Sequence, residues 1–130
     1  MSTVETAHGA AFTTAYTEPS MATPRDARHY VVRFLTGRLP FDLIDRVGLV
    51  AWHLVDNAGR HGGGTIRIGV VLDRDGVQIN VHDQGRVTTF GPDKAGLTIV
   101  KTFASKLEIV PDPFGTGKTV TAHIPHPAGA

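Results

Sequence analysis

Hydrophobic side chains recur every three or four residues along the first patterned part of the chain, which predicts two helices. Thr23 and Pro24 are a suitable N-cap and first residue for the first helix, and Gly37 marks its end. Asp42 is the expected cap of the second helix, which ends at the glycine run 62–64 because glycine carries too much backbone freedom. The apolar stripes comprise Tyr30, Val31, Phe34 and Leu35 in the first helix and Leu43, Val47, Val50, Leu54 and Ala58 in the second.

Beyond the glycine run, the hydrophobic residues alternate with polar ones, which predicts strands. Residues 66–72 and 77–81 flank the turn sequence 73–76, so they are expected to form a β-hairpin. A third helix and two more strands are expected at residues 95–104, 107–110 and 119–124. Strands grouped with segregated helices predict an α+β fold. We expect a two-layer α/β sandwich, with a mainly antiparallel sheet covered on one face by helices.

The chain has 130 residues, of which 41% are hydrophobic, and this is enough for one core. Residues 1–22 are rich in Thr, Ala and Ser and show no helical or strand period, so we expect a flexible tail outside the fold. The expected organisation is this N-terminal tail, one domain at 23–125 and a short C-terminal tail at 126–130.

Charge and cysteine content narrow the classes of function. The 13 Lys and Arg residues nearly balance the 12 Asp and Glu residues, so there is no basic field to attract nucleic acid or anionic lipid. The chain has no cysteine, which excludes disulfides and thiolate metal sites and weakly favours a reducing compartment. No signal-peptide pattern or membrane-spanning apolar run is recognised. We expect a cytoplasmic protein that contacts neither nucleic acid nor a membrane directly.

A row of polar residues lies beside the apolar stripe of the second helix. His53, Asn57 and His61 are spaced four residues apart, so their side chains share one face. Taken alone, such a row is more typical of a solvated helix face than of a site. A metal site that also includes His82 is a further alternative, but no cysteine or closely spaced histidine pair supports it.

Two glycine-containing segments follow at positions suited to ligand binding. Asp83 lies where the second hairpin strand ends, and Gly85 two residues later lets a planar ligand approach the backbone. Gly96 is expected to begin the third helix, whose N-terminal amides can bind an anion. Both patterns also occur in ordinary turns and helix starts.

The segment 115–119 resembles the end of a Walker A phosphate loop. That loop needs glycine five positions before Gly117, where this chain has Asp112, and it needs a helix afterwards. Because the residues after Thr119 alternate like a strand, we interpret the segment as a hairpin turn.

These segments occur in an order that resembles the nucleotide-binding boxes of GHKL-superfamily ATPases, over roughly residues 24–124. The strongest match, to the N box of the bacterial anti-sigma-factor serine/threonine kinases, is the stretch Leu49-Val50-Ala51-Trp52-His53-Leu54-Val55-Asp56-Asn57-Ala58-Gly59-Arg60-His61-Gly62. Asn-Ala-x-Arg-His-Gly endings are characteristic of that box. The resemblance implies the histidine-kinase-like ATPase fold and the binding of ATP with Mg²⁺.

The resemblance also implies a role for each matched residue. Asn57 would hold the magnesium ion that bridges the phosphates, and Asp83 would accept a hydrogen bond from the adenine amino group. The other implied binding residues are Gly85 in the pocket floor, Thr119 at the adenine, Gly96 and Leu97 in the phosphate lid, and His61 in the N box. Lys94 departs from the family pattern, because it stands where the family usually has a glycine. A lysine there can act as a point charge for a phosphate, but a solvated loop lysine is the commoner outcome.

The sequence departs from the family pattern at His53. The family carries a glutamate there, four positions before its Asn, in the role of general base. Neutral imidazole can accept a proton near pH 7, but its reach and charge differ from those of a carboxylate. The lid is also short, because only residues 86–95 separate Gly85 from Gly96. We therefore expect phosphoryl transfer to be slow or absent.

The resulting hypothesis is an ATP-binding regulatory protein of the anti-sigma serine/threonine-kinase type. By resemblance, its partners would be a sigma factor or an anti-sigma antagonist, and a homodimer is possible because the family commonly forms homodimers. The alternative is a catalytically inactive interaction module, a pseudo-kinase that regulates a partner without nucleotide turnover. A fragment of a two-component sensor is disfavoured, since no dimerisation helix or phosphoacceptor segment is recognised.

Overall fold

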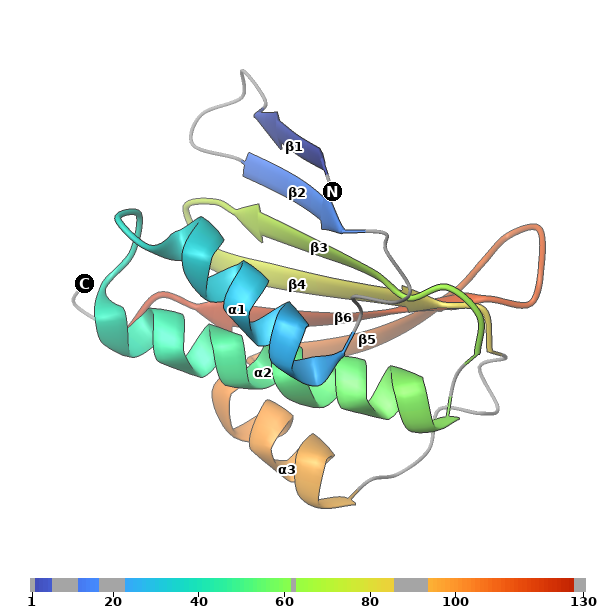
Figure 1. Cartoon of the computed structure of the whole chain (residues 1–130). Coiled ribbons are helices and arrows are strands. Elements are labelled where there is room, and N and C mark those ends of the chain that lie inside the picture. Colours follow the sequence, from blue (N-terminus) through green and yellow to red (C-terminus); the bar gives the residue numbers. More distant parts are fainter. Residues whose placement is uncertain (1, 6–11, 17–22, 62, 86–93, 128–130) are drawn as a thin grey trace.

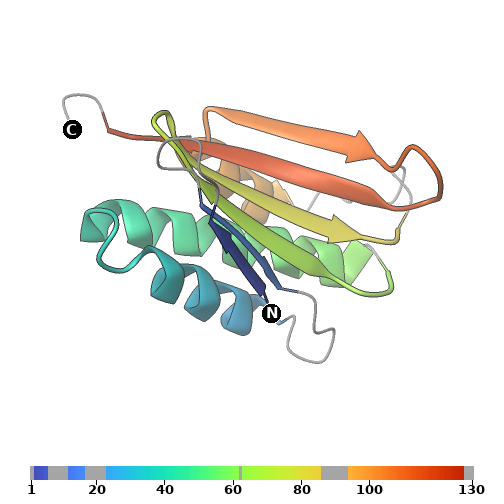
Figure 2. The ribbon, with the colours of Figure 1, turned by 90° about the horizontal axis from the view of Figure 1, so that it is seen from above.

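The computed structural model describes residues 2–5, 12–16, 23–61, 63–85 and 94–127. They form an antiparallel sheet with helices on one face, which confirms the α+β, two-layer expectation (Figures 1 and 2). The elements are β1 (Ser2–Glu5), β2 (Phe12–Tyr16), α1 (Pro24–Leu35), α2 (Phe41–His61), β3 (Arg67–Leu72), β4 (Gly76–Asp83), α3 (Lys94–Phe103), β5 (Lys106–Pro111) and β6 (Lys118–Pro125). None of the helices in these ranges is long and apolar enough to cross a membrane.

The strand order in the sheet is β1-β2-β3-β4-β6-β5. Every neighbouring pair of strands is antiparallel. Strand β6 lies between β4 and β5 and pairs with both. The segments 73–75 and 112–117 therefore connect sheet neighbours as hairpin loops. Residues 115–117 lie in the second loop, as the hairpin interpretation predicts, while Lys118 and Thr119 already belong to β6. The register places Asp83 of β4 opposite Lys118 of β6, so two side chains of opposite charge face each other at that end of the sheet.

The first helix begins as expected, but the second begins earlier. The Thr23 side chain accepts a hydrogen bond from Asp26 N at 3.1 Å, which confirms it as the N-cap of α1. Asp42 is not a cap, because α2 starts at Phe41 and the first turn is closed by Pro40 O, which accepts from Leu43 N at 3.1 Å. Asp42 nevertheless lies in the first turn of α2, where its carboxylate interacts favourably with the positive end of the helix dipole.

The core lies between the helices and the sheet. All five residues of the expected α2 stripe are buried, and so are Ile44, Ala51 and Val55, because α1 and α3 cover α2 on two sides. Gly48 allows α1 to approach closely, since a methyl group there would stand 3.0 Å from Val32 Cγ2. Tyr30 packs at the margin of this core, and burial raises the pKa of its phenol to about 12.

The structure corrects the expected exclusion of residues 1–22 from the fold. Phe12–Tyr16 pairs with β3, and Ser2–Glu5 pairs with Phe12–Tyr16, so both strands extend the sheet. The physical reason is the edge of β3, which would otherwise present unpaired N–H and C=O groups to solvent. Composition alone did not reveal this pairing, because Thr- and Ala-rich strands carry a weak hydrophobic signal.

The β3–β4 turn depends on Gly76. The Asp73 carboxylate accepts hydrogen bonds from Asp75 N at 2.8 Å and from Gly76 N at 3.1 Å. Gly76 has a φ of 150°, and a methyl group on it would overlap the Ile124 carbonyl oxygen of the neighbouring strand. Both the backbone conformation and the close approach of β6 therefore require glycine here.

We predict that Gly76→Ala lowers the free energy of unfolding by at least about 1–3 kcal/mol, because it combines backbone strain with a steric clash. The matched control is Gly59→Ala in α2, where an added methyl group meets no atom within 4 Å. That substitution should raise stability by up to about 1 kcal/mol, since alanine is the better helix former. Urea denaturation measures both, and equal effects of the two substitutions would contradict the role of Gly76.

Candidate functional site

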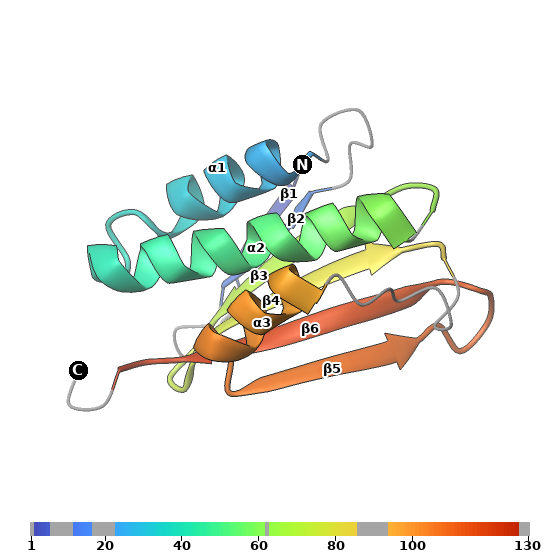
Figure 3. The same cartoon turned by 90° about the horizontal axis from the view of Figure 1, so that it is seen from below.

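Several of the expected binding residues, among them Asn57, Asp83 and Gly85, lie at one end of the molecule. The C-terminal ends of α2 and β4 and the first residue of β6 lie together there (Figure 3). Gln84 N donates to Gly63 O at 2.8 Å, so the glycine run after α2 is bonded directly to the segment after Asp83. Gly64 has a φ of 68° and packs under the Gln84 side chain, which fixes this connection.

Asn57 is a buried polar residue in an otherwise apolar part of α2. Its side chain is 5% exposed, and its Oδ1 atom has no hydrogen-bond partner in the described part of the chain. Asp56, the preceding residue, instead pairs with Arg60 at 3.1 Å on the outer face. Leaving a buried acceptor unsatisfied costs about 1–3 kcal/mol, so a fold retains such a group when something else uses it.

An amide oxygen is a ligand that Mg²⁺ accepts, together with water and phosphate oxygens. The orphaned Oδ1 of Asn57 therefore fits the magnesium role that the resemblance implies. Within the described ranges, no group of three His, Asp or Glu side chains is arranged to hold a metal by itself. A magnesium ion at Asn57 would thus take most of its ligands from water and from a bound phosphate.

Asp83 is 1% exposed at the end of β4, with its side chain on the helix-covered face of the sheet. Its Oδ1 accepts a hydrogen bond from Gly85 N at 2.7 Å, which closes the Asp-x-Gly turn. The same oxygen accepts a second hydrogen bond from Lys118 Nζ at 2.8 Å. Because both bonds fall on Oδ1, neither of them occupies Oδ2.

Lys118 is a site residue that the sequence analysis missed. It is 1% exposed, and its ammonium group forms a buried ion pair with Asp83. The strand pattern contained the signal, since Lys118 precedes Val120 and Ala122 at two-residue spacing and so belongs to the buried face of β6. A lysine on a buried face needs a counter-charge, and Asp83 supplies it.

Thr119 does not lie beside Asp83. The register pairs it with His82, and successive side chains of a strand point to opposite faces. Its side chain therefore belongs to the open face of the sheet, whereas the residue directly opposite Asp83 is Lys118. The adenine contact expected of Thr119 thus has no support from the register.

His53 lies one helical turn before Asn57 on α2. Its ring is half-buried and meets Trp52 edge to face, with ring centroids 5.0 Å apart. Its Nδ1 atom is buried and has no hydrogen-bond partner among the described residues. The imidazole therefore lies on the same side of α2 as Asn57 and offers a nitrogen where the family has a carboxylate.

The remaining expected residues lie at element ends. His61 is the last residue of α2, and α3 begins at Lys94, so Gly96 is its third residue and not its first. Lys94 and Ala95 are good helix formers and extend the helix before the glycine. The amides of Lys94, Ala95 and Gly96 have no intrahelical acceptor, as in any first turn. The side chains of His61 and of 94–97 fall outside the described part, as does the whole lid segment 86–93.

His82 has a different partner from the expected ligands. Its Nε2 lies 2.8 Å from Asp112 Oδ2 on the open face of the sheet. A methyl group on Gly117 would stand 3.0 Å from His82 Nε2 and 2.8 Å from Asp83 O. The hairpin after β5 is thereby held tightly against the end of β4, and His82 faces away from His53 and Asn57.

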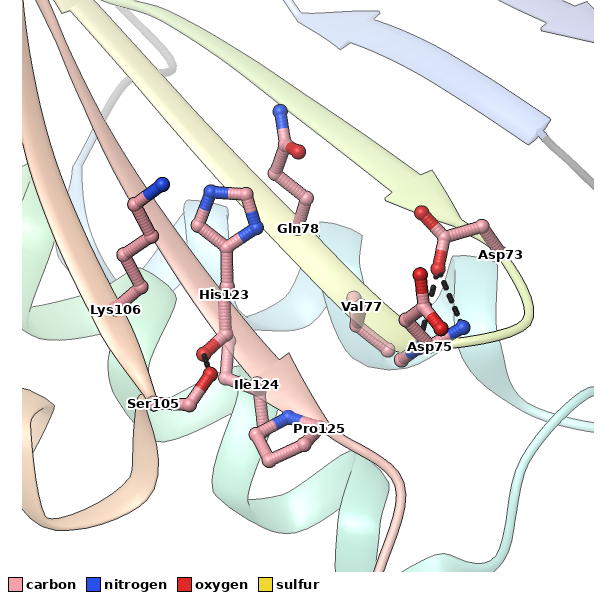
Figure 4. Close-up of a pocket in the computed structure, with 10 residues that line it drawn as sticks. Asp73, Asp75, Val77, Gln78, Ser105, Lys106, His123, Ile124 and Pro125 are labelled. Atoms are coloured by element: carbon pink, nitrogen blue, oxygen red, sulfur yellow. Dashed lines mark hydrogen bonds between the residues drawn. The ribbon is translucent and has the colours of Figure 1, made fainter.

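A separate pocket of about 370 Å³ opens on the other end of the sheet (Figure 4). Its polar lining includes Asp73, Gln78, Lys106 and His123. His123 Nε2 lies 3.0 Å from Glu108 Oε1, and this hydrogen bond together with nearby Lys106 lowers the pKa of Glu108. None of the residues that the sequence analysis selected for nucleotide binding lines this pocket, so it is distinct from the site at Asn57 and Asp83.

We predict that Asn57→Leu raises the free energy of unfolding by about 1 kcal/mol in the absence of ligand. Leucine has the same branching and removes the unsatisfied buried acceptor. The matched control is Thr121→Val, because Thr121 is also a buried polar residue but its Oγ1 donates a hydrogen bond to Asn80 Oδ1 at 2.8 Å. That variant should lose about 1 kcal/mol. Urea denaturation without magnesium or nucleotide measures the free energy of unfolding of both variants. A clear loss of stability in Asn57→Leu would show that Oδ1 is satisfied in the wild type.

Asn57 and Asp83 are therefore assigned as candidate site residues by their burial, their hydrogen bonding and their position at one end of the fold. No protein-family model matches this chain, and a search of curated proteins finds no match.

Proposed function

We propose that this chain binds magnesium–ATP at the end of the molecule where α2 and β4 end, and that it regulates a protein partner in the manner of an anti-sigma serine/threonine kinase. The observation that carries the proposal is the buried Oδ1 of Asn57, which has no partner in the described part of the chain. A polar atom of this kind at the end of an amphipathic helix is a candidate ligand-binding group.

Two other parts of the fold supply complementary chemistry for a nucleotide. Asp83 presents a carboxylate, which accepts hydrogen bonds from an exocyclic amino group. The first turn of α3 supplies backbone N–H groups and the positive end of a helix dipole for phosphate. A magnesium ion, when bound, would neutralise phosphate charge, and Asn57 would orient it through one oxygen.

The identity of residue 53 bears on whether phosphoryl transfer follows ATP binding, because this chain has His53 where a glutamate is expected. In a phosphoryl transfer, a group at this position must orient the attacking oxygen and accept its proton. The His53 ring meets Trp52 edge to face, and a neutral imidazole offers one acceptor nitrogen where a glutamate offers two oxygens. We infer that nucleotide acts mainly as a bound regulator and that transfer to a protein is slow.

A pure interaction module is the second candidate, and one surface favours it. Phe114, at the tip of the β5–β6 hairpin, is 98% exposed, and Val110 at the end of β5 is also exposed. Exposed aromatic side chains are frequent anchors of protein–protein contacts. By resemblance, the partner in either case would be a sigma factor or an anti-sigma antagonist.

Titration calorimetry tests the binding proposal. We expect ATP to bind in the presence of magnesium, and Asn57→Ala to weaken this binding at least tenfold, about 1.4 kcal/mol. The matched control is Asp56→Asn, which removes the ion pair with Arg60 on the outer face of the same helix and should leave ATP affinity unchanged. Absence of binding at millimolar ATP would contradict the proposal.

Phosphoryl transfer is tested separately with radiolabelled ATP and a candidate antagonist protein. We expect slow or undetectable transfer by the wild type and a faster rate in His53→Glu, because the carboxylate restores the expected proton acceptor. Rapid transfer by the wild type would overturn the inference that nucleotide is mainly a regulator.

A further inference from the structure

The ion pair between Asp83 and Lys118 is the most deeply buried charged contact of the described chain. Both side chains are 1% exposed, and Lys118 Nζ lies 2.8 Å from Asp83 Oδ1. Lys118 Nζ also lies 3.4 Å from Gly85 O, so the ammonium group connects both ends of the Asp83–Gly85 turn. The lysine therefore fixes the carboxylate and the backbone that follows it as one unit.

We propose that Lys118 is a positioning residue that keeps Asp83 charged, and that it thereby makes the site select purines with a 6-amino group over purines with a 6-oxo group. The proposal rests on the nucleotide binding proposed above. Lys118 acts through Asp83, because its hydrogen bonds with described residues run to Asp83 and Gly85.

The selectivity follows from the donor and acceptor properties of a carboxyl group. An ionised carboxylate only accepts hydrogen bonds, so it pairs with an amino group and opposes a carbonyl oxygen. A protonated carboxyl group also donates and can pair with a 6-oxo group. Sites built around one hydrogen-bonding pattern reject analogues that reverse it, because a buried polar group is then left unpaired.

Burial explains why the cation is needed. A carboxylate removed from water without a counter-charge takes up a proton instead of staying charged. Among the described residues, Lys118 is the cation in hydrogen-bond contact with Asp83, while the His82–Asp112 pair lies on the opposite face of the sheet. The close approach of β6 at Gly117, where a side chain would crowd Asp83 O, keeps Lys118 in register with its partner.

The experiment compares ATP with inosine triphosphate, which replaces the 6-amino group by a 6-oxo group. We expect the wild type to prefer ATP at least tenfold in calorimetry. Lys118→Met should lose at least tenfold of this preference, and Lys118→Arg, which keeps a cation, should retain most of it. An unchanged preference in Lys118→Met would overturn the proposal.

A second variant covers the case in which Lys118→Met does not fold because Asp83 is left buried without its counter-charge. Asp83→Asn combined with Lys118→Met removes both charges, and the resulting amide can donate as well as accept. It should fold, as judged by thermal unfolding, and should bind the two nucleotides with similar affinity. Retention of the tenfold preference for ATP in this folded double variant would also overturn the proposal.

A readout without nucleotide separates this proposal from the proposed function. Carbon-13 NMR of the Asp83 carboxyl carbon at pH 6 should report a charged group in the wild type and a protonated group in Lys118→Met. A charged Asp83 in Lys118→Met would refute the role of the lysine, even if ATP binds. If the wild type binds neither nucleotide, the proposed function fails and the selectivity fails with it, whatever the NMR spectrum shows.

Discussion

Helix α2 contacts α1, α3 and the sheet at the same time, and the rest of the structure depends on this packing. A helix covered on several sides needs a wide apolar face, and α2 buries hydrophobic side chains from Leu43 to Ala58. Gly48 allows α1 to lie against it without a gap. In this setting Asn57 is an exception, because a polar side chain is kept where an apolar one would pack at lower cost.

The opposite layer contributes a second exception at the same end of the fold. The β4–β6 pairing places Asp83 and Lys118 directly opposite each other on the buried face, so two charges must neutralise one another away from water. A buried ion pair is a weak source of stability, because the desolvation of both groups offsets most of their attraction. The pair is therefore better understood as a way to present a charged, fixed carboxylate than as a contribution to folding.

These two exceptions together favour a ligand that carries both a hydrogen-bond donor and a metal-bound anion, as a magnesium–nucleotide does. His53 limits what can follow binding, since an imidazole packed against Trp52 replaces the expected carboxylate. In the proposed function, binding and turnover are therefore separate properties. The proposal assigns Asn57 and Asp83 to binding and expects His53 to limit turnover.

The sequence by itself determined the helices and strands from Thr23 onward, since hydrophobic spacing of 3.6 or two residues is a local property of the chain. It also singled out Asn57 and Asp83, because motifs are read along the chain. Only the tertiary structure decided that Phe12–Tyr16 joins the sheet, that Thr119 lies on the face away from Asp83, and that Lys118 is the buried partner of that carboxylate. Strand partners and register join residues that lie far apart in the sequence, and a shift of one residue moves every side chain to the other face. For this reason the pairing of Asp83 with Lys118, 35 positions away, came from the sheet and not from any local pattern.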